Sequence, residues 1–244
     1  MRLKTKMLLF LVPAIIVILA CISTYNQYNA REQARAYALQ QAISIAAKES
    51  EPLLSRLQHA EAMTKSLVST LSRFKLEGKT DRAYLRELLA GVSMAEKGFV
   101  GAWTLWEPNA FDGKDAEYVD DADYGNKEGR ANAYWISSGG SFEFNGSEDY
   151  DREDYYAVPK ANGRLNVMPP YVDESTPSKI FMTSIVMPMN IAAKFCGVSG
   201  VDIELKAFGE LIAAAKPYGT GYVMLASDKG TVIGSPRMAD VGKN

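Results

Sequence analysis

Histidine is almost absent from this sequence, in which His59 is the only one among 244 residues. This scarcity argues against metal sites built on histidine and against catalytic dyads or triads that use histidine. The chain also contains no phosphate-binding glycine loop, nucleophile elbow or zinc-protease helix. We therefore expect no enzyme, no metal site and no cofactor.

Cysteine is scarce as well, and the chain carries no excess of positive charge. Cys21 lies inside an apolar N-terminal run and Cys196 lies far from it, so a disulfide between the two is not expected. The 27 lysines and arginines are offset by 29 acidic residues. A nucleic-acid partner is not expected, because no basic stripe is visible.

One long apolar run stands at the N-terminus, where residues 7–24 carry no charge. A helix of this length spans roughly 27 Å, close to the thickness of a hydrocarbon core. Arg2, Lys4 and Lys6 precede the run, which predicts a cytoplasmic segment 1–6, a transmembrane helix 7–25 and export of everything from about residue 26. A cleaved signal peptide, or a lipoprotein signal that uses Cys21, would export the same residues.

Helical composition continues beyond the apolar run, so residues 26–76 are predicted to form a long membrane-emerging helix that kinks or restarts at Pro52. Thr80 is predicted to cap a second helix. An apolar stripe follows helical spacing and either packs on a sheet or forms a dimer seam; its residues are Leu57, Ala60, Leu67, Leu71 and Phe74.

The periodicity changes to that of strands at Phe99–Trp106. The acidic loop that follows (residues 107–130) does not match the calcium-loop spacing, so we expect it to be solvated. Ile180–Met189 and Lys194–Leu205 predict an antiparallel hairpin, and residues 222–235 predict another. Because a lone hairpin is marginal in water, the chain is expected to stop inside a second sheet unit.

Four stretches of this sequence resemble the double-Cache sensor family of bacterial chemoreceptors. The stretches are VGAWTLWEPNAFDGKDAEYVD (100–120), GRANAYW (129–135), REDYYAVPKANG with PPYVDES (152–163 and 169–175), and FMTSIVMPM with FCGVSGVDIEL (181–189 and 195–205). Their order after one membrane helix covers most of the chain.

The resemblance implies an α+β fold of stacked PAS-like antiparallel-sheet modules behind the long helix. It implies a membrane-distal ligand-binding module at 77–212, complete here, and a truncated proximal module at 213–244. It further implies a homodimer in the bacterial inner membrane, facing the periplasm or the cell exterior. The cytoplasmic signalling partners would act through a part that is missing here.

The family's distal pocket holds its ligand with aromatic rings and an acidic residue, which would here be Tyr155, Tyr156 and Asp173. Family members that bind amino acids add an arginine before the aromatic pair, but Arg152 fits that spacing poorly. Aromatic faces attract organic cations by roughly 0.5–2 kcal/mol per contact. The candidate ligand-binding residues are therefore Asp173, Tyr155, Tyr156, Asp154, Tyr134, Trp135, Trp106 and Tyr171.

Ordinary structural roles compete with this interpretation. Trp103 suits core packing, and alternation places it and Trp106 on opposite faces of a strand. Asp154 suits helix capping as well as ligand contact.

The favoured function is a chemoreceptor sensor that binds a small amine or amine-containing metabolite. Alternatives are an amino-acid sensor, the sensor region of a histidine kinase or cyclic-dinucleotide enzyme, and a non-sensing envelope interaction protein.

Overall fold

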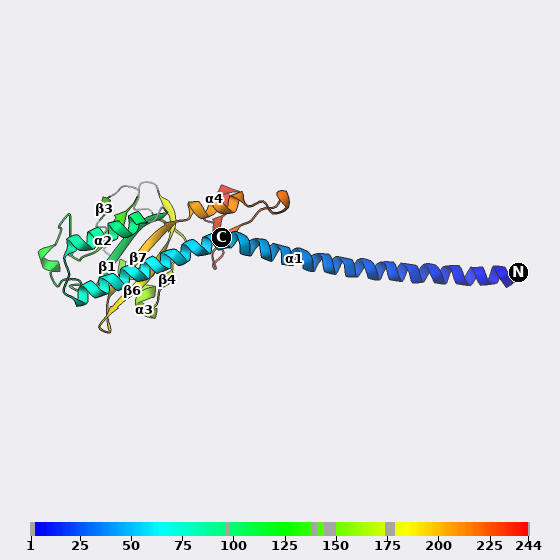
Figure 1. The fold of residues 1–244 in the computed structure, drawn as a ribbon, viewed down its shortest axis with the longest axis horizontal. Coiled ribbons are helices and arrows are strands. Elements are labelled where there is room, and N and C mark those ends of the chain that lie inside the picture. Colours follow the sequence, from blue (N-terminus) through cyan, green and yellow to red (C-terminus); the bar gives the residue numbers. More distant parts are fainter. Residues whose placement is uncertain (1–2, 96–97, 138–140, 144–149, 174–178, 244) are drawn as a thin grey trace. The chain divides into compact units, whose positions relative to one another are not determined.

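The computed structural model describes residues 3–95, 98–137, 141–143, 150–173 and 179–243. The chain divides into two compact units, Met1–Glu51 and Pro52–Asn244. Figure 1 labels most of the helices and strands. The helices are α1 (Leu3–Leu76), α2 (Arg82–Ala95), α3 (Asp154–Asn162) and α4 (Lys206–Ala214). The strands are β1 (Phe99–Trp106), β2 (Ala133–Ile136), β3 (Ser141–Glu143), β4 (Asn166–Val167), β5 (Tyr171–Asp173), β6 (Ile180–Ile191), β7 (Lys194–Glu204), β8 (Leu225–Ala226) and β9 (Val232–Gly234).

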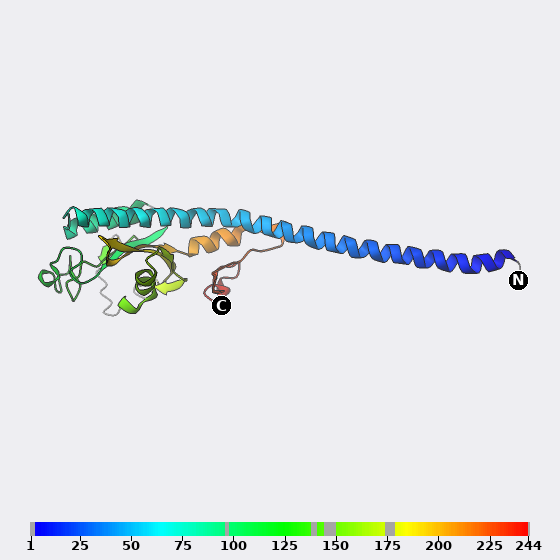
Figure 2. The same cartoon turned by 90° about the horizontal axis from the view of Figure 1, so that it is seen from below.

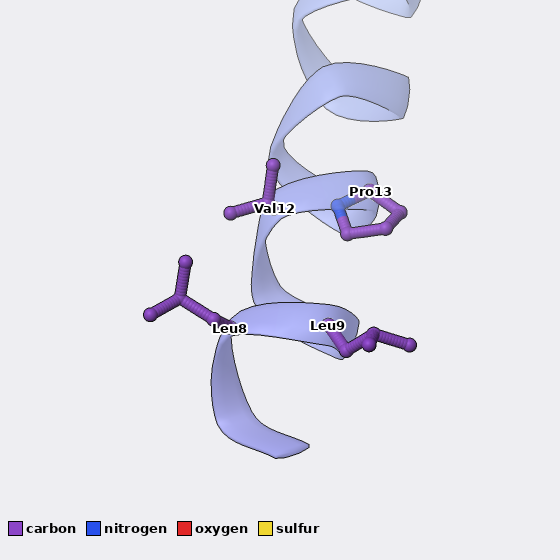
Figure 3. A pocket seen from close by; sticks show the side chains of 4 residues that line it. All are labelled: Leu8, Leu9, Val12 and Pro13. Atoms are coloured by element: carbon purple, nitrogen blue, oxygen red, sulfur yellow. The ribbon is translucent and has the colours of Figure 1, made fainter. Parts of the chain in front are cut away.

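The first unit is the part of helix α1 up to Glu51. It contains an 18-residue window of mean hydropathy 2.7 with none of its surface buried, so by length and composition it is fit to cross a membrane. Figure 3 shows Leu8, Leu9, Val12 and Pro13 around a shallow apolar hollow on the outside of this single helix. Such a surface suits lipid chains, because it offers no polar group to a soluble ligand.

Helix α1 continues through Pro52, so the predicted restart at this residue is wrong. A proline removes one backbone hydrogen bond and crowds the preceding turn. Neither effect ends the helix here, because regular helix continues on both sides of Pro52.

The second unit is built on an antiparallel sheet with the order β3-β2-β1-β7-β6-β4, and β5 also pairs with β6. Strands β6 and β7 form the longest pairing, which confirms the predicted hairpin. Their turn places Ala192 and Ala193 at φ of 51° and 62°. A separate two-stranded sheet joins β8 to β9.

One face of the large sheet is covered by α2 and by the part of α1 that follows Pro52. Figure 2 shows these helices on one side of the sheet and α3 on the other. Of the predicted apolar stripe, Ala60, Leu67 and Leu71 are buried in this helix-side core. The stripe therefore packs on the sheet, as the first of the two interpretations proposed.

The N-terminus of α2 is capped by Asp81, whose Oδ1 accepts a 2.8 Å hydrogen bond from the Ala83 backbone N–H. The prediction of Thr80 as the cap is wrong by one residue. An aspartate carboxylate caps as well as a threonine hydroxyl, and its charge also suits a helix N-terminus.

The acidic loop is held to α2 by Arg82, which is buried. Its guanidinium forms ion pairs with Asp112 at 2.7 Å and Asp115 at 3.1 Å. It also donates hydrogen bonds of 2.7 Å to the carbonyl oxygens of Tyr124 and Gly129. The expectation of a solvated loop is therefore wrong at these two aspartates, whose charges are neutralised inside the protein.

Candidate ligand-binding site

The face of the sheet opposite α1 and α2 is lined with aromatic rings, and we call it the aromatic face. Side chains alternate between the two faces of a strand, so Trp103 of β1 and Tyr134 of β2, which are paired in register, lie on the same face. Helix α3 adds Tyr155, whose ring meets the Trp103 ring edge-on at 5.7 Å between centroids. The buried residues of this face are Trp103, Tyr150, Tyr156, Met168, Val186 and Val198.

A carboxylate lies within this aromatic face. Asp202 of β7 is only 2% exposed. Its Oδ1 accepts hydrogen bonds from the Trp103 indole N–H at 2.9 Å and from the Ser184 hydroxyl at 2.6 Å. Buried acids need such donors, because they have lost water.

The hydrogen-bonded group extends to β5 through Tyr171, whose hydroxyl shares a 2.7 Å hydrogen bond with Ser184. The Tyr134 hydroxyl is also buried beside Asp202, but it makes no hydrogen bond of good geometry to any residue in the described ranges. Burial raises the pKa of Tyr134, and the neighbouring Asp202 raises it further. Both tyrosines stay protonated at neutral pH, since burial raises the pKa of Tyr171 as well.

Burial raises the pKa of the Asp202 carboxyl from 3.8 to about 6. The hydrogen bonds from Ser184 and Trp103 act in the opposite direction, and the nearby carboxylate of Asp173 adds to the rise. Asp173 thus acts electrostatically on Asp202. Among the residues that the structure describes, the largest influences on this pKa come from burial and from Ser184, Trp103, Tyr134 and Asp173, none of which carries a positive charge.

Two glycines make room for the rings. A Cβ added at Gly101 would stand 2.3 Å from Cε2 of the Tyr134 ring and 2.3 Å from the backbone oxygen of Trp135. A Cβ at Gly200 would stand 2.9 Å from Cζ2 of Trp103. All three distances are shorter than side-chain packing allows. The absence of a side chain at Gly101 and at Gly200 therefore lets the rings lie close over the strands.

The predicted residues Tyr134, Tyr155, Tyr171 and Asp173 are brought together in this region. Tyr134 and Tyr155 pack against the aromatic core. Tyr171 and Asp173 lie two residues apart in β5, and both contribute to the electrostatics of Tyr134.

Two further predicted residues lie at α3 in different surroundings. Tyr156 is fully buried between Tyr150 and Phe195, and its hydroxyl donates to Glu107. Asp154 is exposed as the first residue of α3.

The two predicted tryptophans Trp106 and Trp135 belong to the other side of the sheet. Trp106 is 1% exposed in the helix-side core, where it packs against Phe111, and Trp135 packs against the same core. Strand alternation separates Trp106 from Trp103, because the two residues are three positions apart.

Sequence reasoning missed Asp202 and Ser184 and assigned Trp103 to packing. A signal was present for Asp202, since it interrupts the apolar sequence Gly200-Val201-Asp202-Ile203 in a strand that is buried on both faces. No comparable signal marks Ser184. Over the described residues, no cluster of three or more histidine, cysteine, aspartate or glutamate side chains is arranged to hold a metal ion.

A model of the methyl-accepting chemotaxis protein-like first PDC sensor domain matches residues 87–210, just over half of the chain. The chain belongs to this family. The match includes β1, β2 and β5 to β7, and hence every residue of the hydrogen-bonded group around Asp202.

Relatives of the PDC sensor domain support this assignment. The methyl-accepting chemotaxis protein TlpQ of Pseudomonas aeruginosa is 32% identical over an alignment of 163 residues, and the match covers 59% of this chain and 23% of TlpQ. The chain therefore corresponds to about a quarter of the length of that relative.

Solved structures with this fold include methyl-accepting chemotaxis protein X, with 28% identity, a TM-score of 0.75 and coverage of 87% of this chain and 79% of that one. The extracellular domain of the proposed histidine kinase mmHK1S-Z3 is 27% identical, with a TM-score of 0.76 and coverage of 85% and 74%. These matches show the predicted α+β fold, with its curled antiparallel sheet and long N-terminal helix.

Proposed function

We propose that this chain is the extracytoplasmic sensor region of a transmembrane chemoreceptor and that it binds a small amine on the aromatic face. The observation that carries the proposal is the pairing of Asp202 and Asp173 within a group of tyrosine and tryptophan rings, where the largest influences on the Asp202 pKa among the described residues come from neutral or acidic groups.

Charge favours a cationic ligand. A buried carboxylate is costly unless a positive group accompanies it, and the hydrogen bonds that Asp202 accepts within the described residues come from the neutral donors Trp103 and Ser184. A ligand ammonium would supply a positive charge. The Tyr134 hydroxyl beside Asp202 offers a further hydrogen-bonding group at the same place.

The rings favour the same class of ligand. Tryptophan and tyrosine faces attract organic cations, by about 2 kcal/mol where water is excluded. Trp103 and Tyr155 stand edge to face, so their ring planes differ in direction and offer contact to a ligand from two sides.

An amino acid is the alternative ligand. Its carboxylate would need a cation, which in the family is an arginine before the aromatic pair. Arg152 is exposed in the short 3₁₀ turn before α3. Because the carboxylate of Asp173 adds negative charge beside Asp202, we rank an amine above an amino acid.

Signalling would pass along α1, because the same helix carries the apolar run and contributes Leu67 and Leu71 to the core beneath the sheet. A coupling free energy of about 1–3 kcal/mol between ligand binding and helix position would be sufficient. The proposal includes an inner-membrane location, a homodimer and cytoplasmic partners beyond this chain.

A thermal-shift screen of the chain from residue 26 onward, with amines, quaternary amines, amino acids and organic acids, tests the ligand class. An amine at about 100 times its dissociation constant is expected to stabilise the fold by roughly 2.7 kcal/mol. Asp173→Asn should remove this shift, because it removes a charge beside Asp202. Asp154→Asn is the matched control and should retain the shift, because Asp154 is exposed.

Stabilisation by organic acids alone would refute the amine assignment. Stabilisation by amino acids that survives Asp173→Asn would favour the alternative ligand.

A histidine-kinase output is the second candidate for the whole receptor. The likeness to the extracellular domain of mmHK1S-Z3 favours it, whereas the family match and TlpQ favour chemotaxis.

A further inference from the structure

Ser184 lies between the Asp202 carboxylate and the Tyr171 hydroxyl. It is 0% exposed in β6 and is paired in register with Asp202 of β7. Its Oγ lies 2.6 Å from Asp202 Oδ1 and 2.7 Å from the Tyr171 hydroxyl oxygen. All three oxygens therefore form one continuous hydrogen-bonded chain.

The number of protons fixes the direction of this chain. A serine hydroxyl has one proton to donate, and an ionised carboxylate only accepts. When Asp202 is ionised, Ser184 donates to Asp202 and Tyr171 must donate to Ser184. When Asp202 is protonated, the chain can run in the other direction, from Asp202 to Ser184 and from Ser184 to Tyr171. Hydrogen bonds to a charged acceptor are stronger than those between neutral groups, so the chain favours the ionised state of Asp202.

We propose that Ser184 is a positioning residue that keeps Asp202 ionised and oriented as the acceptor for the cationic group of a ligand. The part that concerns the ligand rests on the proposed amine-binding function. The part that concerns the Asp202 charge stands on the three-oxygen chain alone.

Every polar neighbour that faces Asp202 affects how readily its carboxyl group ionises. Trp103 from β1 donates to the same carboxylate oxygen, and Tyr134 from β2 lies beside it. From β5, Asp173 adds negative charge and Tyr171 acts through Ser184. Burial raises the pKa of Asp202 to about 6, and the Ser184 hydrogen bond is the first of the opposing effects.

Removal of the Ser184 hydroxyl should raise the pKa of Asp202. Without the Ser184 hydroxyl, the charged form of Asp202 loses a donor, so the carboxyl should hold its proton to a higher pH. A hydrogen bond to a charged group is strong enough to shift a titration midpoint by about one pH unit. Binding of a cation should then weaken near pH 6 and recover at higher pH.

The first experiment needs no ligand. The indole N–H of Trp103 donates to Asp202, so its ¹⁵N and proton shifts report the protonation of Asp202 in the full chain in detergent micelles. The indole of Trp106, on the other face of the sheet, is an internal reference. We expect a midpoint near pH 6 for the wild type, and one about a pH unit higher for Ser184→Ala.

Three further variants make the test specific. Ser184→Thr restores the hydroxyl and should return the midpoint toward that of the wild type. Ser199→Ala removes another fully buried serine, which donates to the Trp103 carbonyl rather than to Asp202, and should leave the midpoint unchanged. Tyr171→Phe breaks the chain at its other, half-buried end and should raise the midpoint even if Ser184→Ala does not fold.

An unchanged midpoint in Ser184→Ala and Tyr171→Phe would overturn the inference. An equal rise in Ser199→Ala, or no return in Ser184→Thr, would overturn it too, because each would indicate a general loosening of the sheet.

The second experiment measures binding of n-butylamine by calorimetry at pH 6 and pH 8.5. Ser184→Ala should bind about fivefold more weakly than the wild type at pH 6 and nearly equally at pH 8.5. Equal weakening at both pH values would overturn the link to binding. Absence of amine binding in the wild type, together with a raised midpoint in Ser184→Ala, would refute the proposed function and leave the role of Ser184 standing.

Discussion

Asp202 must carry its charge where water cannot solvate it, and this has a consequence for stability as well as for binding. The folded chain holds the Asp202 proton up to about pH 6, whereas an ordinary aspartate releases it near 3.8. The folded state therefore binds more protons than the unfolded state in this window. The contribution of this group to stability falls as the pH rises from about 4 to about 6, by about 3 kcal/mol.

Asp202→Asn should remove this dependence. The amide oxygen can still accept the hydrogen bonds from Trp103 and Ser184, but it carries no charge. At pH 7.5 we expect the variant to melt at or above the wild-type temperature while losing all stabilisation by amines. Thermal unfolding with and without ligand measures both effects, and a variant that melts lower yet keeps its ligand shift would contradict this account.

At the scale of the elements, the attachment of the acidic loop depends on one side chain of α2. Arg82→Leu would leave Asp112 and Asp115 buried without their cation. Removing one partner of a buried ion pair costs about 3–5 kcal/mol, and urea unfolding should show a loss of this size.

Arg86→Leu is the matched control for this prediction, because Arg86 lies one turn further along α2 and pairs with Asp123 of the same loop. Asp123 is 72% exposed, so the loss should be below about 1 kcal/mol. Equal losses in the two variants would show that burial does not distinguish the two ion pairs.

The elements themselves were largely predictable, because their patterns are local. The predicted strand Phe99–Trp106 coincides with β1, and the apolar run of β6 and β7 predicted their hairpin. Within the group around Asp202, Tyr171 was predicted from its aromatic ring, and Asp173 from the resemblance to the sensor family. Ser184 and Asp202 meet through the register of β6 and β7, and the ion pairs of Arg82 bridge 30 or more residues. Neither the meeting of Ser184 and Asp202 nor the ion pairs of Arg82 can be predicted from a local sequence pattern.

At the scale of the whole molecule, the proposal that the apolar run of α1 anchors the chain in a membrane can be tested directly. Ile15→Arg with Ile18→Arg places two charges in the run, each at a cost of about 2.5–3.5 kcal/mol near the centre of a bilayer. We expect the carbonate-resistant membrane fraction to fall sharply.

Ile43→Arg serves as the control, because Ile43 is an equally exposed position of α1 that lies beyond the run. It should leave the membrane fraction unchanged. Unaltered retention of the double variant would argue that the run does not span the membrane.

The space that Gly101 and Gly200 leave beneath the aromatic rings also limits which substitutions such a sensor domain tolerates. Any side chain at Gly101 would collide with both the Tyr134 ring and the backbone of β2, and any side chain at Gly200 with the Trp103 ring and the backbone of β6. Substitutions at Asp173 or Tyr171 change the chemistry offered to a ligand without meeting this barrier. If the proposed site is correct, substitutions in β5 can alter ligand recognition, whereas the two glycines are needed for every ligand that rests on the same rings.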